Sequence, residues 1–403
     1  MTSGTYDVCV IGAGLVGLAT AHALSEDMPG IATVVVDKED NVAAHQSGHN
    51  SGVIHSGLYY RPGSLKARLA VDGARRMYRF CEENGIVHRR SGKLVIATSN
   101  TEIDALDELE RRGRANGLGG LRRLGGGEIA ELEPAAIGVG ALHVPEAGVA
   151  DFGSVARSLA SSLVESVSDI RLVFKVESVE HRLDGVEIGS VEMPVRARVM
   201  VNCAGLHSDR VAAMSGVRSN VKIIPFRGEY YTLDPAAAGG IRALVYPVPD
   251  PRFPFLGVHF TRRWDDSVEV GPNALVALGR EHYRDSRPNL ADMLDVVGFP
   301  GFWRLASRHS VSGAKELFNS KSRRQYARLA SRLVPGIEPG HLRKGGAGVR
   351  AQAVDRSGRI LDDFVFEFTD RTVHVLNAPS PGATASLAIG RHIADQVAPL
   401  LRK

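Results

Sequence analysis

The chain has 403 residues, of which 44% are hydrophobic and 23% are charged, and its formal net charge is +4. This length predicts two domains, and the composition is typical of a soluble globular protein. The small, dispersed charge argues against nucleic-acid binding, and no apolar stretch approaches the length of a membrane span.

The cysteines and the first residues favour a cytoplasmic location. Cys9, Cys81 and Cys203 are few, odd in number and far apart, and each lies in an apolar segment. We therefore expect reduced thiols, with neither disulfides nor a metal site. Residues 1–5 carry no basic segment, and the apolar run after them leads into a glycine motif, so we expect no signal peptide.

A strand, a glycine-rich turn, a helix and a second strand open the chain. The apolar segment 7–11 precedes Gly-Ala-Gly-Leu-Val-Gly at 12–17, and a second strand at 32–36 ends at Asp37. The three glycines form the turn, admit a pyrophosphate and pack the helix on the strand, while the helix N-terminus offers amides to phosphate. We predict a dinucleotide site with Asp37 on the ribose. A glycine-rich turn without a ligand is the alternative.

Residues 45–60 contain many reactive and hydrogen-bonding side chains but show no hydrophobic periodicity. They hold three histidines, several small polar residues, glycines and two tyrosines. No hydrophobic period of 2 or 3.6 runs through them, which predicts a functional loop in place of a strand or helix. Ser64 is expected to cap the next helix, on which Lys66 and Arg68 either belong to a solvated face or face an anion.

The middle of the chain alternates between two patterns. Residues 86–149 are less regular than a strand-helix-strand unit, with strands expected at 92–97 and 141–144. The α/β pattern returns with a helix at 155–165 and strands that include 170–176. Asn202 and the residues after it end the last of these strands, at the sheet edge where open α/β sheets bind ligands.

The next segments indicate a separate layer. Short strands with turn residues between them predict a mostly antiparallel, substrate-facing sheet over 221–276, followed by helices over 290–333. The basic amphipathic segment 321–329 has two interpretations. It is either a solvated surface helix or a docking face for an anionic membrane surface.

The C-terminal part returns to the first pattern. A glycine-rich run over 345–348 leads to Arg350, and a strand, a turn and a helix follow over 373–400. This second strand-turn-helix junction places more free amides at a cofactor. Both domains are therefore predicted to be discontinuous. The cofactor domain comprises 1–85, 150–222 and 341–403, and the substrate domain comprises 86–149 and 223–340.

Together these motifs resemble the D-amino-acid oxidase and glycerol-3-phosphate dehydrogenase superfamily of FAD enzymes, over essentially the whole chain. Within it, the chain most closely resembles the L-2-hydroxyglutarate dehydrogenase/oxidase family. The specific stretches are 45–60, 64–67, 246–261, 271–274 and 377–383.

The resemblance implies a Rossmann-like FAD-binding domain with a mostly antiparallel α+β substrate domain, as in D-amino-acid oxidase. It implies oxidation of an L-2-hydroxy acid to a 2-oxo acid, with electrons passed to quinone or oxygen. If the basic segment 321–329 docks on a membrane, we expect a cytoplasmic protein in peripheral contact with the inner face of the cell membrane. Some superfamily members attach FAD covalently, for which His45 and His49 are the candidates here. We expect non-covalent FAD.

The expected cofactor-binding residues come from the glycine motif, the loop and the later sheet edges. Residues 45–51 are expected along the phosphates and ribityl chain, and residues 53–60 beneath the isoalloxazine. The complete set is Gly12, Ala13, Gly14, Gly17, Asp37, Lys38, His45, Gln46, Ser47, Asn50, Ser51, Gly52, Val53, Val176, Ala204, Gly205, Gly348, Arg350, Pro381, Gly382, Ala383 and Thr384.

The implied reaction requires a base for the hydroxyl proton and cations for the carboxylates. His55 and His259 are the candidate catalytic bases, because histidine titrates near neutral pH. Arg350 is the candidate bidentate clamp for the C1 carboxylate; a structural ion pair is its alternative. A five-carbon dicarboxylate needs further donors, which are expected from Lys66, Arg280, Tyr59, Tyr231 and Tyr246.

Two rival functions are open at this point. One is a related FAD oxidase or dehydrogenase of an amino acid, an N-methyl amine or glycerol 3-phosphate. The other is an FAD-binding regulator without turnover, against which the three histidines of the loop argue.

Overall fold

A computed structural model describes residues 5–166, 168–191, 193–250, 257–283, 288–308 and 322–402. Its first sheet has a parallel centre in the order β20-β12-β1-β2-β9, with antiparallel strands at its margins. The eight strands are β1 (Thr5–Ile11), β2 (Thr33–Val36), β9 (Ser168–Arg171), β10 (Ser178–His181), β11 (Val186–Gly189), β12 (Val195–Asn202), β19 (Val365–Phe368) and β20 (Thr372–Asn377).

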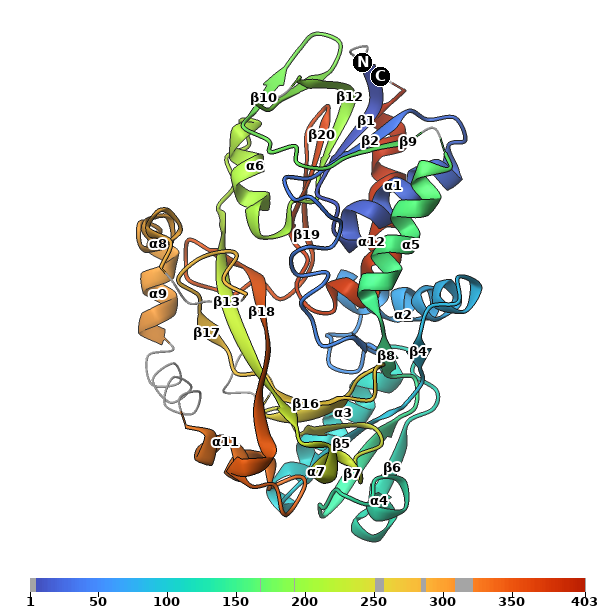
Figure 1. Ribbon diagram of the computed structural model, residues 1–403, viewed down its shortest axis with the longest axis vertical. Coiled ribbons are helices and arrows are strands. Elements are labelled where there is room, and N and C mark those ends of the chain that lie inside the picture. The colour runs from blue at the N-terminus through green and yellow to red at the C-terminus, as the bar shows by residue number, and fades with distance from the viewer. Residues whose placement is uncertain are drawn as a thin grey trace.

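Helices α1 (Leu15–Asp27), α5 (Phe152–Val164) and α12 (Gly382–Leu400) cover one face of this sheet and are seen beside it in Figure 1. Helix α2 (Leu65–Glu83) packs against α12 and extends the same core. Val8 and Val10 of β1 pack against these helices, whereas Cys9 and Ile11 pack on the opposite face with Val211 of α6 (Ser208–Met214). Because successive strand residues point to opposite faces, a strand buried on both sides is apolar throughout.

The second sheet has nine strands and is antiparallel except for one parallel pair, β5 with β14. Its strands are β5 (Lys93–Ala97), β6 (Arg122–Gly125), β7 (Gly140–Val144), β13 (Val221–Leu233), β14 (Leu244–Pro247), β15 (His259–Arg262), β16 (Val268–Gly271), β17 (Leu275–Val276) and β18 (Leu342–Asp355). The long pair β13 and β18 runs from beside the first sheet into the second (Figure 1).

A small third sheet contains β3 (Val53–Ile54), β4 (His88–Arg89) and β8 (Gly148–Ala150). By pairing Val53 with Val149, it fixes the middle of the polar loop, residues 45–60. The other helices are α3 (Ile103–Ala115), α4 (Gly126–Leu132), α7 (Pro235–Ala238), α8 (Leu290–Val297), α9 (Pro300–Arg308) and α11 (Arg323–Ala330), with short 3-10 helices η1 (Asn100–Glu102), η2 (Gly205–His207) and η3 (Pro339–His341).

The predicted fold class is confirmed: a Rossmann-like parallel sheet is joined to a mostly antiparallel one. One local prediction was wrong, because the strand expected at 170–176 ends at Arg171. The glycine-rich run before Arg350 lies within the fourteen-residue strand β18. The domain limits stay a prediction, although β18, placed in the cofactor domain, pairs with β13 of the second sheet.

Three further observations concern the sequence predictions. Cys9, Cys81 and Cys203 are all free thiols. Among the described residues, no helix is both long enough and apolar enough to cross a membrane. Residues 251–256 of the 246–261 stretch, and Lys321 of the basic segment, lie outside the described residues.

Candidate active site

A cavity of about 1250 Å³ is lined by residues of both large sheets. Its walls include the β1–α1 turn, the polar loop, the ends of β14 and β15, the middle of β18 and the start of α12. Ligand pockets commonly measure roughly 300–1,000 Å³. The cavity is therefore large enough for a dinucleotide and a small acid together.

The β1–α1 turn is shaped for close approach of a ligand. Gly12 has φ +109°, and a Cβ on it would lie 2.5 Å from the Cys203 carbonyl oxygen. A Cβ on Gly17 would lie 1.9 Å from the Gly12 oxygen, so the third glycine permits helix-to-strand packing. Gly14 caps α1 without a side-chain hydrogen bond. The helix N-terminus thus presents backbone amides and its positive dipole end to an anion.

Two polar side chains hold this turn. Asp37 accepts a hydrogen bond from the Ala13 amide at 2.7 Å, and Ser47 accepts one from the Leu15 amide at 2.9 Å. Asp37 and Ser47 both line the cavity. The predicted acid after β2 therefore braces the glycine turn while keeping contact with the cavity.

Most of the expected cofactor residues line this one cavity. Ala13, Gly17 and Gly52 do not: Ala13 is fully buried, Gly17 packs against the Gly12 backbone, and Gly52 lines a smaller second cavity. The residues on the wall are Gly12, Gly14, Asp37, Lys38, His45, Gln46, Ser47, Asn50, Ser51, Val53, Val176, Ala204, Gly205, Gly348, Arg350, Pro381, Gly382, Ala383 and Thr384.

A second helix N-terminus, that of α12, also opens on the cavity without a side-chain cap. The Thr384 hydroxyl donates to the Val53 carbonyl and accepts from the His55 amide, both at 3.1 Å. The first turn of α12 therefore holds the backbone of His55 directly.

His55 and His259 both line the cavity, although one follows β3 and the other begins β15. Burial, reinforced by the charges of Lys93 and Arg350, holds the pKa of His55 well below its usual value. Burial also lowers the pKa of His259 to about 3. His259 Nδ1 lies 2.8 Å from the Gly257 carbonyl and donates to it, which leaves Nε2 as the acceptor of the neutral ring. Both rings are therefore neutral near pH 7 and able to accept a proton.

The predicted tyrosines divide between two sides of the second sheet. Tyr59 and Tyr246 line the cavity, and Tyr246 stacks on His259 with ring centres 4.0 Å apart. Tyr231 was wrongly placed: it packs against Tyr326, whereas Tyr230 lines the cavity. Adjacent residues of β13 face opposite sides, so an error of one residue changes the side.

Two of the proposed cations already have carboxylate partners. Lys66 lines the cavity, but its Nζ lies 2.8 Å from Asp362 Oδ1. Arg280 is fully buried, is absent from the cavity wall and pairs with Asp209 and Asp295. The prediction that Arg280 contributes to the substrate site was therefore wrong, because two acids neutralise it.

Arg350 lines the cavity from β18, where it pairs with Phe226 of β13. Its charge acts on both histidines and on Tyr230, with which it shares a side-chain hydrogen bond. Gly348, two residues earlier, lets the His49 backbone approach the strand, since a Cβ there would lie 2.8 Å from the His49 oxygen. The cation thus faces the cavity close to both candidate bases.

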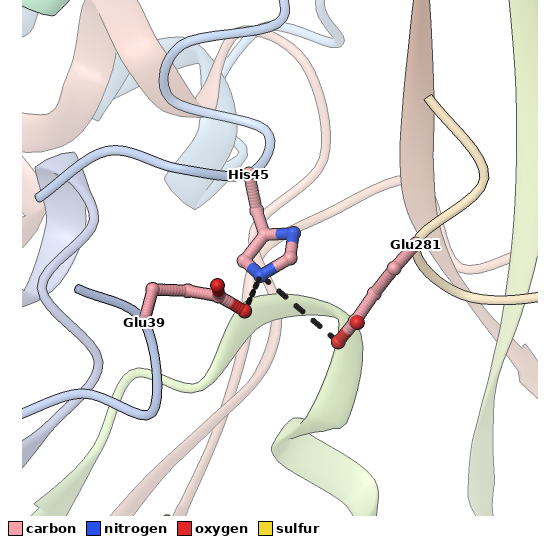
Figure 2. A group of neighbouring side chains, drawn as sticks. All are labelled: Glu39, His45 and Glu281. Carbon is pink, nitrogen blue, oxygen red and sulfur yellow. Dashed lines mark hydrogen bonds and ion pairs between the residues drawn. The ribbon is translucent and has the colours of Figure 1, made fainter. Parts of the chain in front are cut away.

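Figure 2 shows Glu39, His45 and Glu281 converging at another part of the cavity wall. Their ligand atoms are close enough to suit a metal ion. Lys38 Nζ, however, lies 2.8 Å from Glu281 and 3.1 Å from His45 Nε2, so an ammonium group already supplies the positive charge. A hydrogen bond from His207, together with Lys38, holds the pKa of Glu281 well below its usual range. We assign these residues to an ion-pair network.

Sequence reasoning missed two charged residues of this region. Glu281 lines the cavity, and Lys93 lies directly behind it against Tyr59 and Tyr246. Lys93 did leave a signal, because a lysine is unusual in an otherwise apolar strand. The glycine turn, the two open helix ends and the size of the cavity together fit FAD.

Comparisons with known proteins agree with this fit. Residues 7–396 match the protein family described as FAD dependent oxidoreductase. The chain is 44% identical to L-2-hydroxyglutarate dehydrogenase of Indibacter alkaliphilus, covering 97% of this chain and 98% of that protein. It is 40% identical to the mitochondrial L-2-hydroxyglutarate dehydrogenase of Homo sapiens (98% and 89% covered) and to L-2-hydroxyglutarate dehydrogenase of Escherichia coli K12 (98% and 94%).

Solved structures share the fold at lower identity. One is the FAD-bound L-alpha-glycerophosphate oxidase from Mycoplasma pneumoniae, with TM-score 0.79, 21% identity and coverage of 99% of this chain and 95% of that one. Another is glycine oxidase from Geobacillus kaustophilus, with TM-score 0.70, 18% identity and coverage of 98% and 95%.

Proposed function

The chain belongs to the family of FAD-dependent oxidoreductases, and on that premise we propose that it oxidises L-2-hydroxyglutarate to 2-oxoglutarate. The observation that carries this proposal is 40–44% identity, over nearly the full length, to proteins named L-2-hydroxyglutarate dehydrogenase. The cavity supports it, because two neutral histidines and an arginine meet there.

The backbone positions the cofactor in this proposal. The glycine turn and the N-terminus of α1 would bind the pyrophosphate, and Asp37 would hold the adenosine ribose. The start of α12 lies beside the His55 backbone, where the catalytic part of the cavity is proposed. When bound, FAD accepts the hydride that leaves C2 of the substrate.

The chain supplies the proton transfer. One neutral histidine, His55 or His259, takes the proton of the C2 hydroxyl as the C2–H bond breaks and the C2–O bond becomes a carbonyl. Low pKa values keep both rings unprotonated before substrate binds. The tautomer of His259 leaves Nε2 as the proton acceptor.

Arg350 orients the substrate. Its guanidinium binds the C1 carboxylate, and a planar fork can do so through two parallel hydrogen bonds. Tyr59, Tyr246 and Tyr230 surround the same part of the cavity and limit the access of water. Fixing the acid in this way aligns C2 for transfer.

Product analysis tests this function. The purified holoenzyme is incubated with an artificial electron acceptor and with L-2-hydroxyglutarate, glycerol 3-phosphate, glycine or N-methylglycine in separate reactions. We expect 2-oxoglutarate from the first and no turnover of the others. Turnover of glycerol 3-phosphate or of an amine in its place would assign the chain to a related FAD enzyme, and no turnover at all would favour a regulator.

The electron acceptor is proposed to be quinone or oxygen.

Membrane contact is proposed to lie on α8 and α9. Four apolar side chains are exposed there, Leu290, Leu294, Val297 and Trp303, with Leu290 and Leu294 each 72% exposed. Exposed arginines at 304 and 308 follow on α9. An apolar patch with arginines and an interfacial tryptophan suits an anionic bilayer.

The predicted docking helix is less suitable. The apolar side of α11 is buried, with Tyr326, Ala327 and Ala330 in the core of the second sheet. We expect co-sedimentation with anionic phosphatidylglycerol vesicles to be lost in the double variant Leu294→Ser, Trp303→Ser and retained in Arg324→Ser on α11. Equal binding by the wild type, the double variant and Arg324→Ser would show that the apolar patch on α8 and α9 does not contact the membrane. Reoxidation by a soluble quinone, compared with oxygen, identifies the acceptor.

A further inference from the structure

Lys93 is a buried cation for which the described residues provide no counter-charge. It begins β5 in the interior of the second sheet, between β14 and β7, and is 1% exposed. Its Nζ lies 4.1 Å from the Tyr246 ring centre and 5.0 Å from that of Tyr59. Among the described residues, no carboxylate forms an ion pair with it, and burial alone lowers its pKa to about 7.

Other cations around the cavity differ from Lys93 in this respect. Lys66 pairs with Asp362, and Lys38 pairs with Glu281. Arg210 and Arg112, which also line the cavity, pair with Asp292 and Glu108 respectively. A buried charge without a partner is costly, and proteins retain one chiefly where function needs it.

The side chain of Lys93 is directed toward the substrate part of the cavity. Val95 and Ala97, on the same face of β5, pack with Leu58 of the polar loop and with α3. The charge of Lys93 acts on both His55 and His259. Lys93 does not itself form the cavity surface; Tyr59 and Tyr246, against which its Nζ packs, do so.

Two neighbouring polar atoms are also unsatisfied. The Tyr59 hydroxyl and His55 Nδ1 are buried without a hydrogen-bond partner in the part of the chain that the structure describes. No hydrogen bond therefore holds the Tyr59 hydroxyl, and the Lys93 ammonium lies directly behind the ring. An acid entering here would meet an ammonium group and a phenol donor together.

We propose that Lys93 binds the carboxylate at C5 of the substrate, so that Arg350 and Lys93 each hold one carboxylate of a five-carbon dicarboxylate. This inference rests on the proposed function and assigns the residue that selects dicarboxylates. A monocarboxylate of the same chain length leaves the lysine buried and unpaired, and such a site discriminates strongly against a ligand that lacks the matching group.

Ligand binding to the oxidised holoenzyme tests the proposal without turnover. Calorimetry compares 2-oxoglutarate with 2-oxopentanoate, which has the same chain but lacks the C5 carboxylate. Lys93→Met should weaken 2-oxoglutarate binding by about 30- to 100-fold. Its 2-oxopentanoate binding should stay within about twofold of the wild type, because that ligand makes no ion pair with Lys93.

Two further variants separate the roles. Arg350→Ala should weaken both ligands to the same degree, since both carry the C1 carboxylate. Lys93→Arg retains the charge and should keep a preference for 2-oxoglutarate. Lys93→Gln, a polar neutral replacement, serves the same comparison should the methionine variant not fold.

Failure of the Lys93 assignment and failure of the proposed function would give different results. A Lys93→Met or Lys93→Gln enzyme that keeps the wild-type ratio of the two affinities, or loses both equally, would overturn the assignment of Lys93. If wild-type flavin is not reduced by L-2-hydroxyglutarate at all, the proposed function fails instead.

Discussion

The Thr384 hydroxyl joins the first turn of α12 to His55, because it accepts a hydrogen bond from the His55 amide at 3.1 Å while donating to the Val53 carbonyl. Thr384→Val keeps the shape and removes both bonds. Losing about 1 kcal/mol of positioning free energy should slow flavin reduction by roughly fivefold while FAD stays bound. Thr384→Ser, which retains the hydroxyl, is the matched control. Rapid-reaction absorbance measures the rate, and equal rates in both variants would show that this anchor has no role in catalysis.

The two histidines should be separable by rate. Replacing the base should slow flavin reduction by about 10²- to 10⁴-fold, the usual contribution of general base catalysis. Asparagine at position 55 and glutamine at position 259 conserve polarity, and the FAD content of each purified protein controls for folding. The residue whose replacement leaves the limiting reduction rate unchanged is not the base.

Arg350 should act mainly through binding. Arg350→Lys retains the charge but loses the planar fork, whereas Arg350→Ala loses both. We expect KM for L-2-hydroxyglutarate to rise by about tenfold in the lysine variant and further in the alanine variant. Steady-state kinetics with an artificial acceptor measures this. A wild-type KM and kcat in the alanine variant would remove Arg350 from the substrate site.

Lys93 should make the stability of the apoprotein depend on pH. Its pKa is about 7 when folded against 10.5 when exposed, so between these values the unfolded chain binds more protons. The free energy of unfolding should therefore rise with pH across this window. The titratable groups that face Lys93 keep one protonation state in the folded protein across this window. Burial keeps His55 and His259 neutral and raises the pKa of Tyr59 and Tyr246.

Urea unfolding of wild-type and Lys93→Met apoprotein measures this effect. Between pH 7.5 and 9.5 the free energy of unfolding of the wild type should rise by roughly 2 kcal/mol relative to that of Lys93→Met. At pH 7.5 the Lys93→Met protein should be the more stable of the two. Parallel pH profiles would contradict the burial of an uncompensated lysine. A residue that costs stability yet improves substrate binding is what the inferred role requires.

Local patterns were enough to predict the fold and the cofactor turn. The glycine motif, the apolar strands and Asp37 are close in sequence, and their roles follow from backbone geometry. His55, His259 and Arg350 were expected at one site because of the family resemblance, and all three line the cavity. Their individual roles remain predictions for the variants above to test.

The errors have a common physical origin in tertiary pairing. Whether Tyr230 or Tyr231 faces the cavity depends on the register of β13, which sequence leaves open to a one-residue shift. Arg280 looked available because Asp209, 71 residues earlier, is distant in sequence. Lys93 was overlooked because a strand pattern reveals burial but not which side chains pack against the residue.

Anaerobic flavin reduction tests the central claim most directly. The holoenzyme is mixed with L-2-hydroxyglutarate or with its D enantiomer, and loss of the yellow flavin absorbance is followed in a stopped-flow instrument. We expect rapid, complete reduction by the L enantiomer, stoichiometric 2-oxoglutarate and no reduction by the D enantiomer. Flavin that stays oxidised with L-2-hydroxyglutarate, or that is reduced faster by another acid or amine, would contradict the proposed function.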